Sequence, residues 1–178
     1  MDSINKNQPE HNKSNLSGSK AIEKLKELVE KAETCFFSTF DLNSHANPTR
    51  PMSVLKVTDE GQLLFLSATD SHKNKELQAD PMVQLYFQGS KHSDFLNLTG
   101  RASISKDKQI IEELWNPILK TWFTEGKDDA RISVLTVDPQ DGYYWDNKHG
   151  NAIAGIKIMI GAAIGKTLDD SIEGRLKP

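Results

Sequence analysis

Residues 50–73 read RPMSVLKVTDEGQLLFLSATDSHK, a pattern that indicates two strands, a turn between them and the beginning of a helix. Residues 49–57 and 63–67 are rich in apolar and β-branched residues, which favours strands, and the segment Asp59-Glu-Gly predicts a tight turn between them. After the second strand, Asp70 or Ser71 would cap a helix that ends near Ala79. The stretch therefore predicts a β-hairpin that leads directly into a helix.

Cationic and hydroxyl side chains gather at this strand-to-helix junction. Arg50 lies on the first predicted strand, Ser67 ends the second, and His72 and Lys73 open the helix. A phosphate dianion requires cations together with free backbone N–H groups, which a helix N-terminus supplies. The junction therefore predicts a site that holds the phosphate of a cofactor. The same residues also fit a solvated helix start with ordinary surface cations.

Two further features have both a binding and a structural interpretation. Lys56 ends an otherwise apolar strand, where its ammonium can either reach the polar edge of a ligand or extend to solvent. The segment Tyr143-Tyr-Trp would give a flat wall for a ring system, but aromatic residues in a strand also pack in cores.

The rest of the chain predicts a mainly β protein, a small antiparallel barrel of six to seven strands with helices at its ends. Gly100 predicts a bulge or bend in its strand, Ser17 or Ser19 would cap the first helix, and Asn116-Pro117 would start a short one. The other predicted strands are 35–40, 82–88, 95–104, 132–137 and 143–145, and the other helices are 19–33, 107–115, a short one after Pro117, and 152–164. We expect a disordered tail at 1–18, a barrel domain at 19–165 and a C-terminal tail at 166–178.

The composition excludes several classes of function. The 22 Lys and Arg residues nearly balance 25 Asp and Glu residues, so no large positive field favours nucleic acid. The single cysteine, Cys35, cannot form a disulfide within the chain and fits a reducing cytoplasm, and residues 1–19 lack the apolar run of a signal peptide. The five histidines are too scattered for a zinc site, and the apolar run 152–164 is too short to span a bilayer. We therefore expect a cytoplasmic protein without a metal, nucleic-acid or membrane partner.

Six segments, in consistent order between Ile22 and Ile164, resemble the FMN-binding split-barrel superfamily of pyridoxamine 5′-phosphate oxidase-like proteins, and within it the bacterial general stress protein branch. The segments are Arg50-Pro-Met-Ser, Ser71-His-Lys-Asn-Lys-Glu-Leu, Asp80-Pro-Met-Val-Gln-Leu-Tyr-Phe, Phe95-Leu-Asn-Leu-Thr-Gly-Arg-Ala, Glu112-Glu-Leu-Trp-Asn-Pro-Ile-Leu-Lys-Thr-Trp-Phe and Tyr144-Trp-Asp.

The resemblance implies a homodimer with one FMN, or alternatively FAD, in each of two clefts at the subunit interface. The strand from Met52 to Lys56 would then lie along the flavin, and Trp145 would reach it across the interface. The cofactor-binding residues implied in this way are Arg50, Met52, Ser53, Lys56, Leu66, Ser67, His72, Lys73 and Trp145.

One departure from the oxidases bears on activity. In pyridoxamine 5′-phosphate oxidases an Arg-x-His pair follows the tryptophan, whereas this chain continues from Trp145 as Asp-Asn-Lys-His-Gly-Asn. Without those cations a pyridoxine phosphate would bind poorly, so we expect no vitamin B6 oxidase activity. The leading hypothesis is an FMN-dependent oxidoreductase with a small-molecule electron donor and acceptor. The alternatives are a flavin carrier or sensor without turnover, and a haem-binding split barrel.

Overall fold

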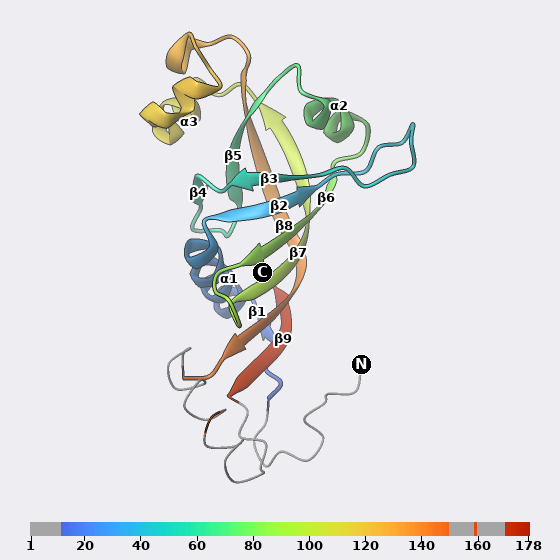
Figure 1. Ribbon diagram of the computed structural model, residues 1–178, viewed down its shortest axis with the longest axis vertical. Helices are drawn as coiled ribbons and strands as arrows, with labels where there is room; N and C mark the ends of the chain where they lie inside the picture. Colours follow the sequence, from blue (N-terminus) through green and yellow to red (C-terminus); the bar gives the residue numbers. More distant parts are fainter. Residues whose placement is uncertain (1–11, 150–158, 160–169) are drawn as a thin grey trace.

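The computed structural model describes residues 12–149, Met159 and residues 170–178 (Figure 1). The strands in these ranges are β1 (Leu16–Ser17), β2 (Thr34–Ser38), β3 (Thr49–Ser53), β4 (Lys56–Val57), β5 (Leu63–Ala68), β6 (Met82–Gln88), β7 (Phe95–Ser105), β8 (Ile132–Asn147) and β9 (Ser171–Lys177). The helices are α1 (Ser19–Ala32), α2 (His72–Ala79), α3 (Lys108–Leu114) and the 3₁₀ helices η1 (Pro117–Thr121) and η2 (Gly126–Asp128).

The strands form a split barrel around the long strand β8. Strand β7 pairs with β8 along most of its length, while on the other edge β5 pairs with the first part of β8 and β9 with the last part. The strand order is β1-β9-β8-β7-β6-β2-β3, and β4 pairs with β5. The predicted strand 49–57 is interrupted at Val54 and Leu55: its first part, β3, pairs with β2, and only its last part, β4, forms the hairpin with β5. The predicted fold class is confirmed, with more strands than expected among the described residues.

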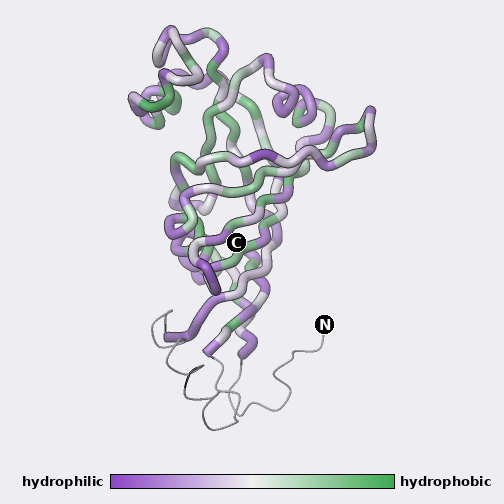
Figure 2. The backbone as a smooth tube through the Cα atoms, viewed as in Figure 1, coloured by the Kyte–Doolittle hydropathy of each residue, from purple (hydrophilic) through white to green (hydrophobic). Residues whose placement is uncertain are grey.

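The barrel interior holds the main core. Phe37 of β2 and Phe65 of β5 meet edge to face, with ring centroids 5.3 Å apart, and α1 packs Leu25 and Leu28 against this interior. Figure 2 shows hydrophobic residues along the strands, whereas α2 is mainly hydrophilic. A second cluster, beneath α3, consists of Leu64, Ile111, Leu114, Phe123, Ile132 and Val134.

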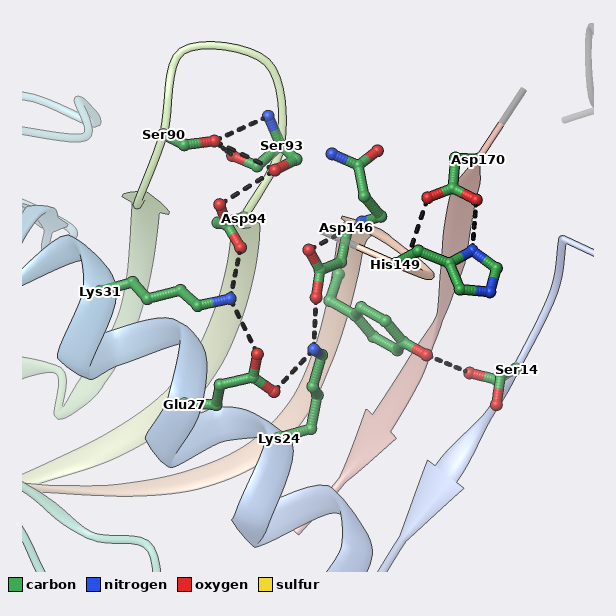
Figure 3. Close-up of polar contacts among 12 residues, drawn as sticks. Ser14, Lys24, Glu27, Lys31, Ser90, Ser93, Asp94, Asp146, His149 and Asp170 are labelled. Atoms are coloured by element: carbon green, nitrogen blue, oxygen red, sulfur yellow. Dashed lines mark hydrogen bonds and ion pairs between the residues drawn. The ribbon is translucent and has the colours of Figure 1, made fainter. Parts of the chain in front are cut away.

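Ion pairs fasten α1 to the end of β8 and to the β6–β7 hairpin (Figure 3). Lys24 contacts Asp146 of β8, and Lys31 contacts Asp94 of the hairpin at 2.8 Å. Glu27 accepts hydrogen bonds from both lysines, each at 2.8 Å. Burial alone would raise the pKa of Asp94, but hydrogen bonds from Lys31 and nearby serines outweigh it and hold that pKa well below its usual range.

Several local predictions are confirmed. Ser71 caps α2 by accepting the Asn74 N–H at 3.2 Å, Asp107 caps α3, and Asn116 precedes Pro117 at the start of η1. The register of β7 shifts between Thr99 and Gly100, as the predicted bulge requires.

The cap of α1 differs from the prediction. Neither Ser17 nor Ser19 caps the helix; the N-cap is Gly18, with φ 57°, a left-handed conformation that favours glycine.

The segment expected to connect two strands, 138–142, instead continues β8. Pro139 pairs with Gly100 at the register shift, where Gln140 of β8 is the extra residue, and an irregularity of this kind leaves room for a proline that cannot donate a ladder hydrogen bond.

The expected tails also contain structure. Ser171–Lys177 forms β9 against the part of β8 that β5 leaves unpaired, and Leu176 is fully buried. Leu16–Ser17 pairs with β9 in parallel, and a Cβ atom at Gly174 would lie 1.8 Å from the Ser14 carbonyl oxygen, so glycine lets the two segments approach. The predicted helix 152–164 lies outside the described residues, apart from Met159, which is helical.

Candidate functional site

The start of α2 faces two inward-pointing residues of β3. Arg50 and Met52 alternate with exposed neighbours along the strand, and the Lys73 ammonium lies 3.1 Å from the Met52 sulfur. A thioether is a weak acceptor, and in the described part of the chain Lys73 has no other hydrogen-bond acceptor. Burial, together with the positive charge of Arg50, lowers the pKa of Lys73 to about 8.

Arg50 is held by two polar partners. Its guanidinium donates to Glu76 of α2 at 2.9 Å and to the Thr39 hydroxyl at 2.7 Å. Thr39 in turn donates to the same Glu76 carboxylate. Arg50 therefore ties β3 to α2, and together with Lys73 and Glu76 it leaves one net positive charge at the pocket.

Backbone donors complete this pocket. Within the described residues, the N–H groups of His72 and Lys73 have no acceptor, as is usual in the first turn of a helix. The His72 side chain is exposed, and Lys73 is half-buried. We use the name α2 pocket for this set of groups: Arg50, Met52, Lys73 and the two free N–H groups.

Ser67 lies next to the α2 pocket but is engaged in the barrel interior. Its buried hydroxyl donates to the Asn74 side-chain oxygen at 2.9 Å, and the Asn74 amide donates to the Ser133 hydroxyl at 2.8 Å. Leu66 points to the opposite face of β5, where it packs against the cluster beneath α3.

Two other predicted residues line a separate hollow. Lys56 forms an ion pair with Glu113 of α3, and its side chain is 41% exposed. Ser53 is also exposed, and both residues border a hollow that continues past Glu33 and the end of α1.

Trp145 lies on the outer face of the sheet. It packs against Tyr143, with ring centroids 4.7 Å apart, and borders an open groove of about 560 Å³. Phe36 is 58% exposed and Tyr86 43% exposed in the same groove, which we call the aromatic groove. Within one chain, the α2 pocket and the aromatic groove share no lining side chain, although the exposed Phe36 and Pro51 extend the groove along the outer side of β2 and β3.

The structure thus brings together Arg50, Met52 and Lys73, while Ser67 is bonded to Ser71 and Asn74 at the start of the same helix and the His72 side chain is exposed. It places Ser53 and Lys56 in a second hollow, Leu66 on the far side of β5, and Trp145 in the aromatic groove. Four residues that hold this region together were not predicted from the sequence: Thr39, Asn74, Glu76 and Ser133. Of these, only Asn74 could have been noticed from the local sequence, because it lies three residues after the capping Ser71. The others take part through packing between elements that are distant in the sequence.

Two other kinds of site receive no support in the described ranges. In residues 12–149, 159 and 170–178, no three His, Cys, Asp or Glu side chains are grouped to hold a metal ion. The helices in those ranges are all too short or too polar to cross a bilayer.

In its general class, the protein is a split barrel that carries cationic side chains at a strand-to-helix junction. Residues 20–169 match the model of the family described as pyridoxamine 5′-phosphate oxidase like, and the chain belongs to that family. It is 31% identical over 100 residues to protein bli-3 of Neurospora crassa, covering 51% of this chain and 48% of that protein. It is 26% identical over 78 residues to general stress protein 26 of Bacillus subtilis, covering 42% and 55% respectively, so the chain spans about half the length of these curated relatives.

Solved structures share the fold. A general stress protein 26 from Jannaschia sp. CCS1 superposes with a TM-score of 0.73 at 19% identity, covering 88% of this chain and 97% of that one. The general stress protein 26 of Bacillus anthracis gives 0.61 at 22% identity, covering 69% and 92%. A pyridoxamine 5′-phosphate oxidase-related, FMN-binding protein from Nostoc punctiforme gives 0.55 at 15% identity, covering 71% and 80%.

Proposed function

We propose that this protein binds FMN, with its phosphate in the α2 pocket, and acts as a flavin-dependent oxidoreductase of the general stress type. The observation that carries the proposal is the Lys73 ammonium, a half-buried cation beside Arg50 whose hydrogen-bond acceptor is a thioether. Such a cation is stabilised by an anion, and the two free N–H groups of α2 are donors suited to phosphate oxygens.

For the flavin beyond its phosphate, we propose contacts with the remaining predicted residues. Met52 and Ser53 would border the ring system and Lys56 its polar edge, with the backbone of Leu66 and Ser67 along the linking chain. Bound there, FMN would supply the electron transfer chemistry, while these residues bind and orient it. FAD is the alternative cofactor in this proposal, and its diphosphate would then bind in the α2 pocket.

We also propose that two copies pair through the aromatic groove. Phe36, Tyr86 and Trp145 expose apolar area on one continuous sheet face, which a second copy would cover. Pairing would bring Trp145 of one protomer to the flavin of the other. Size-exclusion chromatography with light scattering tests this proposal: Phe36→Glu should yield monomers, whereas Ile118→Glu, at an exposed position outside the groove, should leave the dimer intact.

In the proposed reaction, small molecules donate electrons to the flavin and accept electrons from it, and vitamin B6 phosphates are not among the substrates. The cytoplasm is the proposed compartment, because Cys35 is a buried free thiol. Anaerobic addition of NADH or NADPH to the FMN-loaded protein tests turnover: bleaching of the flavin supports an oxidoreductase, and a flavin that no nicotinamide reduces supports a carrier or sensor.

The binding proposal has its own test. Titration of FMN, followed by flavin fluorescence, should show at least about tenfold weaker binding for Lys73→Ala, which loses a charge-assisted contact. Lys75→Ala is the matched control, because this lysine lies on the exposed side of the same helix. Equal affinity of wild type and Lys73→Ala, or a wild type that does not bind FMN, refutes the α2 pocket as the phosphate site.

A further inference from the structure

A buried chain of polar side chains connects the start of α2 to two strands. The Asn74 oxygen accepts hydrogen bonds from the hydroxyls of Ser67, at 2.9 Å, and Ser71, at 3.2 Å. The Asn74 amide nitrogen donates to the Ser133 hydroxyl at 2.8 Å, and Ser133 donates to the Ser67 carbonyl oxygen at 2.9 Å. One side chain of α2 is thereby bonded to β5 and to β8.

These hydrogen-bonded side chains are buried in the protein interior. Asn74 is 1% exposed, Ser133 fully buried and Ser67 4% exposed. A buried amide without partners would cost about 1–3 kcal/mol, so removal of any member leaves its neighbours with unmet hydrogen-bonding capacity. These bonds are directional, and they therefore fix both the distance and the rotation of α2 relative to the strands.

The direction of the bonds gives the serines a role different from phosphate contact. The hydroxyls of Ser67 and Ser71 each find an acceptor inside this network, either the Asn74 oxygen or, at 3.3 Å, each other, so their bonding is directed away from an anion in the pocket. The donors left for an anion are the N–H groups of His72 and Lys73 and the Lys73 ammonium, which sit one and two residues before Asn74. The place of these donors is thus set by the residue that immediately follows them.

We propose that Asn74 is the positioning residue of the α2 pocket: through Ser67 and Ser133 it holds the free N–H groups and the ammonium where a terminal phosphate binds. This inference rests on the proposed FMN binding. Asn74 itself touches no part of the ligand and acts only through the helix that it anchors.

The test compares FMN with riboflavin, which lacks the phosphate. Dissociation constants for both ligands are measured by flavin fluorescence, and the readout is the ratio of the riboflavin value to the FMN value. Asn74→Ala should lower this ratio by about tenfold, the effect of losing roughly 1.4 kcal/mol of phosphate interaction, while riboflavin binding stays within about twofold.

Tyr144→Phe is the matched structural control. It removes a partly buried hydrogen bond, from the Tyr144 hydroxyl to the Ser14 carbonyl oxygen at 2.9 Å, that is not part of the α2 network. This variant should unfold at a lower temperature and keep the wild-type ratio. A merely structural Asn74 would behave in the same way, so an unchanged ratio in Asn74→Ala overturns the proposal.

Ser133→Ala decides the matter if Asn74→Ala does not fold. It keeps Asn74 and removes one bond to its amide nitrogen, and a ratio lowered about threefold supports the proposal, whereas a wild-type ratio overturns it. Failure of the proposed function is recognised separately, because a wild-type protein with equal affinity for FMN and riboflavin has no phosphate site for Asn74 to position.

Discussion

FMN affinity should decrease about tenfold between pH 7 and pH 9, because Lys73 loses its proton in that interval. Burial of the ammonium and repulsion from Arg50 together lower the pKa of Lys73 to about 8, against the opposing effect of Glu76 and Cys35. Bound phosphate favours the charged lysine, so FMN binds the protonated protein more tightly. Affinity is therefore fully present below pH 8 and is lost as the pH rises through that value.

The magnitude follows from the fraction of charged lysine. With a pKa of about 8, roughly nine tenths of the Lys73 side chains are charged at pH 7 and roughly one tenth at pH 9. Other groups keep their charge over the interval: a phosphate monoester is already dianionic above about pH 6, and arginine stays protonated. Burial raises the pKa of the Cys35 thiol to about 12, so this neighbour remains neutral.

The assay is a fluorescence titration of FMN at pH 7, 8 and 9 and constant ionic strength. Lys73→Arg keeps its charge and should bind equally at all three values, and riboflavin should show no dependence in any variant. His72→Gln should retain the decrease, which assigns it to the ammonium and not to the imidazole. The reasoning is wrong if wild-type affinity is constant from pH 7 to pH 9, or if Lys73→Arg loses affinity as the wild type does.

Three further outcomes are expected. Lys73→Met should raise the free energy of unfolding of the flavin-free protein at pH 7 by about 1–3 kcal/mol in urea titrations. The reason is that the pKa of Lys73 is lower in the folded protein than in the unfolded chain, so the charged lysine destabilises the fold; a less stable variant would contradict this. Asp94→Asn should cost about 1–3 kcal/mol at pH 7 and lose less stability than wild type when the pH falls below 4, because the pKa of Asp94 is lowered in the fold; parallel losses in both proteins would exclude this role. Gly174→Ala should release the segment that precedes α1, since its Cβ would lie 1.8 Å from the Ser14 carbonyl oxygen, and proteolysis near Ser14 should accelerate; an unchanged cleavage rate would show that the two segments accommodate the methyl group and stay paired.

The parts of this fold that follow from neighbouring residues could be predicted. The hairpin into α2, the Ser71 cap and the bulge at Gly100 each depend on local conformational preferences of a few consecutive residues. The closeness of Ser67 to the start of α2 could be anticipated for the same reason, since Ser67 of β5 and the Ser71 cap are four residues apart, whereas Arg50 lies on β3, which pairs with β2 and reaches α2 only through long-range packing.

The remaining features depend on partners far away in the chain. No pattern near Ser171 tells that its strand completes the free edge of β8, because that edge exists only where β5 stops. In the same way, the ion pairs of Arg50 with Glu76 and of Lys56 with Glu113 join separate elements, and the sequence showed the cations without their partners. Long-range pairing therefore decides which predicted cations remain available to a ligand.

Helix α2 explains why polar contacts matter at this site. It buries only Asn74 and Leu77, so its apolar packing amounts to one leucine side chain, about 1.5–3 kcal/mol. Apolar contacts are not directional and would let so short a helix rotate or slide. Hydrogen bonds from Asn74 and the ion pair of Glu76 restrict both motions, and they do so from positions within one turn of the free N–H groups. A hydrophilic helix held in this way keeps its N-terminus in one place, which is the property that an anion site requires.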